Sequence, residues 1–118
     1  MKRLQKHLRE HIVVCGFGLS GAVAVRELLE NGVDPVGIIV IDPQQSALEA
    51  VTALGVAGLL GDPSREDLLQ QVQGRFAKAV IIAVQEDATA ILLTLTVRSV
   101  APKTKIVVRI QEQTSSGN

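Results

Sequence analysis

Aromatic side chains are scarce in this chain of 118 residues, which has no Trp, no Tyr and only two Phe, Phe17 and Phe76. So few aromatics offer no platform on which the bases of a single-stranded nucleic acid could stack. An excess of one charge is also lacking, since twelve Lys and Arg balance twelve Asp and Glu. A net charge of zero supplies no overall field to attract nucleic acid or an anionic membrane. We therefore expect no nucleic-acid partner.

Cysteine and long apolar runs are equally rare. Cys15 is the single cysteine, so no intramolecular disulfide can form, and its place at the end of an apolar run favours a buried, inert thiol. No apolar run approaches the ~18 residues that a membrane span needs, and no secretory signal is visible. His7 and His11 have no Cys or carboxylate cluster at ligand spacing, so no metal site is predicted. The expected compartment is the cytoplasm.

A glycine motif dominates what is present. The apolar run at residues 11–15 leads into Gly16-x-Gly18-x-x-Gly21 and then into a helical pattern. In dinucleotide-binding folds the first glycine permits a tight turn, the second lets the backbone approach a pyrophosphate, and the third lets the helix pack closely. The helix start then presents free N–H groups and a positive dipole end to the phosphates. The motif predicts a nucleotide-binding βαβ unit.

Asp42 supports this interpretation, because it ends a second β-rich run and follows Gly21 by 21 residues. An acidic residue about this far along the unit binds ribose hydroxyls and repels a 2′-phosphate. NAD or NADH is therefore favoured over NADP. The same geometry would hold the ribose of ADP or ATP, and the choice among these ligands stays open.

Strands and helices alternate along the rest of the chain. We predict strands at 11–15, 36–41, 56–60, 79–84 and 105–110, with helices at 19–30, from Pro43 to Leu54, after Ser64, and at 88–100. This alternation, with 47% hydrophobic residues, predicts an α/β, Rossmann-like, doubly wound parallel sheet in the order 3-2-1-4-5 with helices on both faces.

The predicted helix at 88–100 is apolar around nearly its whole circumference. In so small a domain, a helix of this kind has more apolar surface than one sheet can cover. We interpret it as an assembly face, with simple core burial as the alternative.

Acidic residues at two strand ends have more than one interpretation. Asp62 or Ser64 could cap the helix that follows, or Asp62 could face the nucleotide crevice. Asp87 is expected to cap the helix at 88–100. Asp62 with Glu86 or Asp87 could offer oxygens to Ca²⁺, a thin case for an ion that needs 6 to 8 of them.

Taken together, these residues resemble one family. His11-x-Val-Val-Cys-Gly-Phe-Gly, the strand-end Asp42, the Gly61-Asp62 turn, Ala83-Val-Gln-Glu-Asp87 and Val107-Val-Arg-Ile110 are similar to the RCK, or KTN, regulatory domains of potassium channels and transporters. The match covers roughly residues 9–113. Leu19 stands where many members have Arg after the second glycine, and Ala90 stands where an Asn is common.

The resemblance implies a ligand-sensing domain at the cytoplasmic face of the cell membrane, assembled with a potassium channel or transporter subunit. It implies no enzymatic activity. It also implies dimers, formed here through residues 88–100, that build an octameric ring in the full protein. Residues 1–10 would be a basic linker, 11–113 the N-terminal lobe, and 114–118 a disordered tail.

By the same resemblance, the glycines would hold the phosphates, Asp42 the ribose, and Asp62 the adenosine end. The full expected site comprises Gly16, Phe17, Gly18, Leu19, Ser20, Gly21, Asp42, Pro43, Gly61, Asp62, Val84 and Glu86. The ligand would be NAD or NADH, with ATP, ADP or AMP as alternatives. Two alternative functions are the cofactor-binding half of an NAD-dependent oxidoreductase and a scaffold lobe of a gating ring that binds nothing. The oxidoreductase is disfavoured because no His or Lys stands at a strand end in the crevice.

Overall fold

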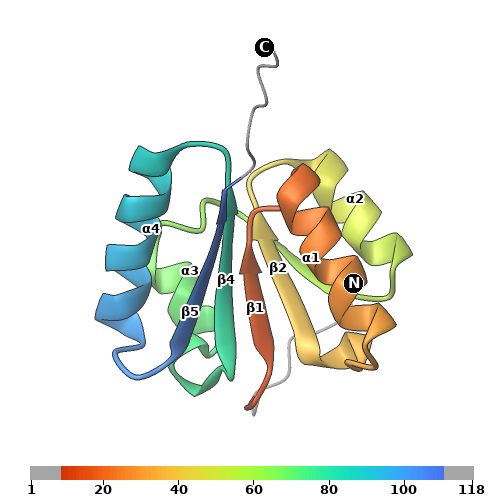
Figure 1. Cartoon of the computed structure of the whole chain (residues 1–118), viewed down its shortest axis with the longest axis horizontal. Helices are drawn as coiled ribbons and strands as arrows, with labels where there is room; N and C mark the ends of the chain where they lie inside the picture. Colours follow the sequence, from red (N-terminus) through yellow and green to blue (C-terminus); the bar gives the residue numbers. More distant parts are fainter. Residues whose placement is uncertain (1–8, 111–118) are drawn as a thin grey trace.

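In the computed structural model of the chain, which describes residues 9–110, five parallel strands form one sheet in the order β3-β2-β1-β4-β5 (Figure 1). The predicted fold class and strand order are therefore confirmed. Most of the predicted basic linker and all of the predicted tail lie outside the described residues. The strands are β1 (Ile12–Cys15), β2 (Ile38–Asp42), β3 (Ala57–Leu60), β4 (Ala79–Val84) and β5 (Lys105–Ile110). The helices are α1 (Leu19–Glu30), α2 (Gln45–Ala53), α3 (Glu66–Gln71) and α4 (Asp87–Val100), with 3₁₀ turns η1 (Pro35–Gly37) and η2 (Gly74–Phe76).

Two apolar layers cover the two faces of the sheet. Alternate residues of a strand point to opposite faces, so Ile12 and Val14 of β1 pack in one cluster with α1 and α2 residues. Val13 and Cys15 pack in the other cluster, with α3 and α4 residues. Figure 1 shows α1 and α2 on one side of the sheet and α3 and α4 on the other. The central strand is buried throughout because both of its faces are covered.

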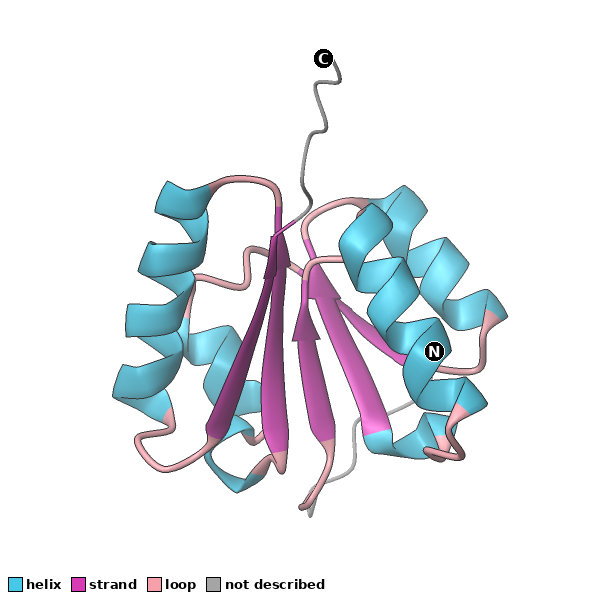
Figure 2. Ribbon diagram, viewed as in Figure 1, coloured by secondary structure: helices cyan, strands magenta, loops and turns pink. Residues whose placement is uncertain are grey.

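All five strands run in one direction, so their carboxyl ends meet at one edge of the sheet and their amino ends at the other (Figure 2). β1 is the centre of the sheet, pairing with β2 through Cys15 and Ile41 and with β4 through Cys15 and Ile82. The loops after β1, β2 and β4 therefore meet at the carboxyl edge, where parallel sheets of this type bind ligands.

The second strand begins later than predicted. Residues 35–37 form η1 instead of the start of a strand, and Asp34 accepts a hydrogen bond from the Val36 N–H at 3.0 Å. Pro35 fixes the first position of this turn, and the Asp34 side chain closes it. The strand therefore starts at Ile38 instead of Val36.

The predicted helix caps are wrong. α3 begins after Arg65, and no side-chain hydrogen bond caps it. The Asp62 carboxylate instead accepts hydrogen bonds from Ser64 N–H at 2.9 Å and from Ser64 Oγ at 2.8 Å. Asp87 is not a cap either, because it lies in the first turn of α4. Short polar side chains can close a local turn as readily as they cap a helix, and here the turn prevails.

α4 has one buried and one exposed apolar face. Ala90, Leu93 and Val97 pack in the core, whereas Ile91, Leu92 and Leu95 are 61%, 55% and 64% exposed. This division agrees with the prediction that the helix has more apolar surface than its own domain covers. With 14 residues, α4 is the longest helix in the described part of the chain, and no helix there is long and apolar enough to cross a bilayer.

Candidate functional site

The glycine turn between β1 and α1 is built as the motif predicts. Gly16 has φ +101°, a conformation that residues with side chains rarely adopt, and its N–H donates to the Ile41 carbonyl at 2.9 Å. A Cβ on Gly16 would collide with the Ala83 carbonyl oxygen of β4. A Cβ on Gly21 would collide with the Gly16 carbonyl oxygen, so α1 rests directly on the turn. The first and third glycines are therefore required by the fold.

Gly18 differs from the other two glycines of the motif. It occupies the N-cap position of α1 with φ −76°, and a Cβ built on it would meet nothing within 4 Å. The fold therefore has no steric need for glycine here. Open space over this backbone is what the approach of a ligand requires.

The amino terminus of α1 is left without a side-chain cap. No side chain hydrogen-bonds to it, and its first turn has no acidic residue. The orphan N–H groups and the positive end of the helix dipole favour an anion at this position. Leu19 beside the turn is 63% exposed, so it presents an apolar side chain to solvent.

Asp42 is the side chain that joins β2 to the glycine turn. It is only 8% exposed, and its two oxygens accept separate backbone hydrogen bonds. Oδ2 accepts the Phe17 N–H and Oδ1 accepts the Gln44 N–H, both at 2.8 Å. Each carboxylate oxygen has a second lone pair, so ribose hydroxyls can still donate to this group. The sequence predicted the ribose role, but not that Asp42 holds the turn.

The other predicted residues lie at the same edge on both sides of β1. Pro43 follows β2, and Gly61 follows β3, with its N–H donating to the Asp42 carbonyl at 3.0 Å. Asp62 is exposed and its Oδ1 is occupied by Ser64. On the other side, Val84 ends β4 and is partly buried, and the exposed Glu86 follows it. The structure thus brings the predicted residues to one edge without assigning a ligand contact to any of them.

This edge carries mostly negative charge. Its acidic residues are Asp42, Asp62, Glu66, Asp67, Glu86 and Asp87. Arg65 is bound to Asp67, with guanidinium-to-carboxylate distances of 2.9 and 3.1 Å, and this contact lowers the pKa of Asp67. Among residues 9–110, no group of three or more His, Cys, Asp or Glu is arranged to hold a metal ion.

Cys15 is not available for chemistry at this site. Its side chain is fully buried below the glycine turn, and burial raises the pKa of the thiol to about 12. A thiolate is the reactive form of cysteine. The expectation of an inert thiol therefore agrees with the structure.

The model of the TrkA-N domain family matches residues 12–117. The chain belongs to the TrkA-N family. This TrkA-N domain is 31% identical over 101 residues to the glutathione-regulated potassium-efflux system protein KefC of Salmonella paratyphi B. That alignment covers 86% of the chain and 16% of KefC, so the chain spans only about a sixth of the length of such relatives.

Two solved structures show the same fold. The GsuK channel bound to NAD superposes with a TM-score of 0.75 at 23% identity, covering 92% of this chain and 19% of that one. The C-terminal domain of a Shewanella denitrificans Kef protein in its AMP-bound form has a TM-score of 0.69 at 24% identity, covering 84% and 57%. The resemblance to RCK and KTN domains is therefore confirmed.

Proposed function

We propose that this TrkA-N domain is a ligand-sensing regulatory domain that binds NAD(H) or an adenine nucleotide at the carboxyl edge of its sheet. The observation that carries the proposal is the pairing of an open Gly18 with Asp42, which holds the adjacent Phe17 N–H at 2.8 Å. The turn offers helix N–H groups to phosphates, and the carboxylate beside it suits ribose hydroxyls. Family membership supports a regulatory role.

The ligand is proposed to lack a 2′-phosphate. The Asp42 carboxyl group is buried beside the turn and the surrounding edge is acidic, which disfavours a further phosphate beside the ribose. NAD or NADH satisfies this condition, and so do AMP, ADP and ATP. The NAD reported in GsuK and the AMP reported in the Kef domain are consistent with this set.

The domain is proposed to act through assembly with a potassium channel or transporter at the cytoplasmic face of the membrane. KefC is described as part of a potassium-efflux system, and GsuK as a channel. The exposed apolar face of α4 supports a homodimer contact within such an assembly. In the full protein, such dimers would build an octameric ring. A ligand would then act by binding one arrangement of paired domains more tightly than another.

The cofactor-binding half of an NAD-dependent oxidoreductase is the weaker candidate function. Such an enzyme needs a group that exchanges a proton with substrate near the nicotinamide. His11 is buried at the opposite, amino end of β1, and the Cys15 thiol is buried with a pKa of about 12. Neither side chain is placed to act in the crevice.

Gly18→Ala is the sharpest test, because the fold does not need this glycine. The φ of −76° and the free space at Gly18 allow Ala, so stability should change by no more than about 1 kcal/mol. A methyl group on the approach path should weaken NADH binding at least roughly tenfold, which is about 1.4 kcal/mol. Calorimetric titration with NADH, NAD, NADP, AMP, ADP and ATP measures this. Gly37→Ala is the matched control, since its site in η1 is also open but lies at the amino edge.

Asp42→Asn separates the ribose contact from the support of the turn. Asn keeps one oxygen that can accept a backbone hydrogen bond, whereas Ala would remove both bonds and loosen the turn. We expect Asn to remain folded, to bind NADH more weakly, and to discriminate less against NADP. Unchanged NADH affinity in both Gly18→Ala and Asp42→Asn would refute the proposed site.

A further inference from the structure

The two ends of the sheet carry opposite charge. The carboxyl edge is acidic, as described above, whereas exposed cations gather at the amino edge of β1, β4 and β5. We call this group the cationic end, and it comprises Arg9, Arg75, Lys78, Lys103 and Lys105. Its acidic member is Glu10, while Glu30 and Asp34 lie beyond it on the α1 side. Although the chain has no net charge, its positive and negative side chains are therefore separated along the direction of the strands.

Backbone contacts place these cations together. The Lys78 N–H donates to the His11 carbonyl at 2.7 Å, which joins the starts of β4 and β1. Lys105, the first residue of β5, is the register partner of Ala79, and Lys78 immediately precedes Ala79, so the two lysines lie at the starts of neighbouring strands. Lys105 is held by the sheet, and the other four cations lie in η2 or in the segments that lead into β1, β4 and β5.

Phe76 orders the two arginines. The Arg9 guanidinium lies 4.3 Å from the centre of the Phe76 ring, and that of Arg75 lies 4.7 Å from it. Such contacts hold a guanidinium over the ring while leaving its N–H groups free to donate. The ring that a nucleic-acid base would need for stacking is thus already occupied.

The cations of this end are not neutralised by acidic partners within the described residues. The ion pairs found there, Arg65 with Asp67 and Arg109 with Glu27, both lie elsewhere. Arg98 adds positive charge nearby, although its guanidinium also donates to the Pro102 and Thr104 carbonyls at 2.8 Å.

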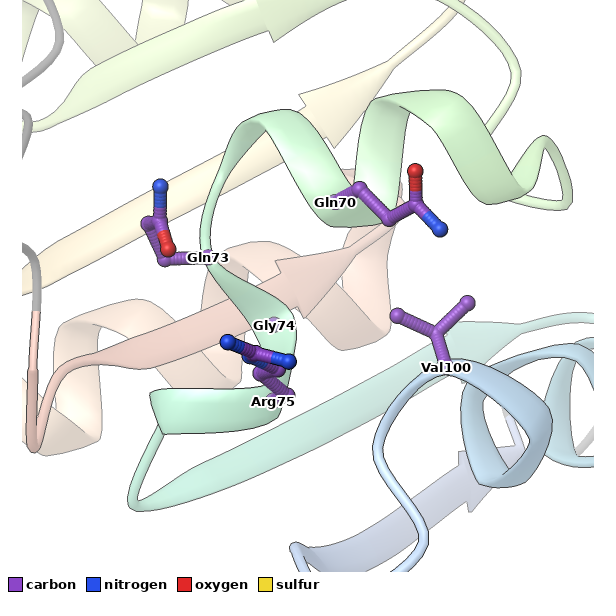
Figure 3. A pocket seen from close by; sticks show the side chains of 5 residues that line it. All are labelled: Gln70, Gln73, Gly74, Arg75 and Val100. Atoms are coloured by element: carbon purple, nitrogen blue, oxygen red, sulfur yellow. The ribbon is translucent and has the colours of Figure 1, made fainter.

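A pocket of about 310 Å³ lies beside this surface, lined by Gln70, Gln73, Gly74, Arg75 and Val100. Figure 3 shows Gln70 on α3, Arg75 on η2 and Val100 at the end of α4. Its described lining offers amide and guanidinium donors and no carboxylate. Donors of this kind suit the phosphate of a headgroup.

We propose that the cationic end docks on a bilayer surface that contains anionic lipid. Each Lys or Arg near such a surface strengthens binding roughly fivefold, which is about 1 kcal/mol. Docked in this way, the acidic carboxyl edge points away from the lipid. The nucleotide crevice then opens toward the solution.

Co-sedimentation with vesicles tests this surface directly. The chain should bind vesicles of phosphatidylcholine mixed with phosphatidylglycerol and not vesicles of phosphatidylcholine alone. Added NaCl should weaken binding, since salt screens exposed charges. The double variant Lys103→Gln, Lys105→Gln should bind roughly 25-fold more weakly, at about fivefold per lysine. The matched control is Arg26→Gln, Arg65→Gln, which removes two exposed cations from other faces and should bind as the unaltered chain does.

Each remaining outcome would overturn the proposal. If both double variants lose affinity equally, net charge and not this surface controls binding. If neither does, the segment before Arg9 acts alone. Tighter binding to a double-stranded DNA oligonucleotide, lost in the Lys103 and Lys105 variant, would assign the surface to nucleic acid. A thermal unfolding curve for each variant confirms that the compared proteins are folded. The proposed nucleotide site is tested separately, by titration, so failure of the lipid proposal would not contradict it.

Discussion

At the residue scale, His11 is a buried group whose surroundings change its ionisation. It is 2% exposed, its Nε2 lies 2.7 Å from the Val72 carbonyl oxygen, and its Nδ1 has no hydrogen-bond partner in the described structure. Burial lowers the pKa of His11 from 6.5, and the bond to Val72 only partly opposes this. A proton on His11 is therefore disfavoured in the folded state.

We expect the free energy of unfolding to decrease as the pH falls below 6.5. The unfolded chain then binds a proton that folded His11 resists, so acid favours unfolding, by at most about 1.4 kcal/mol per pH unit until the folded pKa is reached. Urea unfolding over a pH series measures this decrease. In His11→Gln, whose amide can still donate to the Val72 carbonyl, it should disappear between pH 6.5 and the carboxylate range, while His7→Gln should retain it. An equal decrease in both variants would show that His11 is not responsible.

Single residues also show which structural roles could be predicted from the sequence. The roles of Gly16 and Gly21 follow from a spacing that one fold explains, and the structure agrees. The double hydrogen bond of Asp42 could not be foreseen, because it joins backbone groups of two separate loops. Asp62 could not be assigned either, since a helix cap and a local turn use the same side-chain oxygen.

At the element scale, α4 carries the exposed apolar face that we propose as the contact between domains. Ile91, Leu92 and Leu95 form an exposed apolar strip beside the β5 edge, where Val108 is 44% exposed. A shallow groove lined by Asp87, Ala90, Ile91, Thr94 and Val108 runs between this helix and that strand. An apolar surface of this kind is typical of an interaction site.

Leu95→Lys should weaken self-association roughly ten- to a hundredfold, because burying a leucine contributes about 1.5–3 kcal/mol. Nucleotide binding should persist, as Leu95 lies outside the crevice. Sedimentation velocity over a concentration series measures the change. The control is Ala50→Lys, which adds the same charge at an exposed site of α2 on the opposite face of the sheet. Identical profiles for all three proteins would exclude α4 as the contact.

The elements were predicted better than their ends. Strand order follows from β-α alternation and from the rule that crossovers are right-handed, so it required no contact information. The start of β2 was misplaced because Val36 fits a strand by composition but lies in a turn set by Asp34 and Pro35. Local hydrogen bonds decide such boundaries, and hydrophobic pattern does not report them.

At the scale of the whole molecule, a ligand that binds only the folded domain must stabilise it. At 100 times its dissociation constant, a nucleotide adds about 2.7 kcal/mol to the free energy of unfolding. For a domain of this size, that corresponds to a rise of roughly 10 °C in Tm. Thermal unfolding with NADH should show this rise in the unaltered chain and a smaller one in Gly18→Ala. A rise of equal size with NADP would contradict the role given to Asp42.

The distribution of charge is a property of the whole molecule that composition does not predict. Twelve charges of each sign sum to zero and predicted no attraction to an anionic surface. In the fold, the parallel strands carry the acidic residues to one edge, while the cationic end lies at the other. Sequence order alone gives no such separation, because it arises only when every strand points the same way.

The hydrogen bonds of Asp42 have a bearing on signalling. The glycine turn is held in place by Asp42 before any ligand arrives, so binding need not order a loop and loses little entropy in doing so. Under the proposed function, we therefore expect a ligand to change how copies of the domain are oriented and not how one copy is folded.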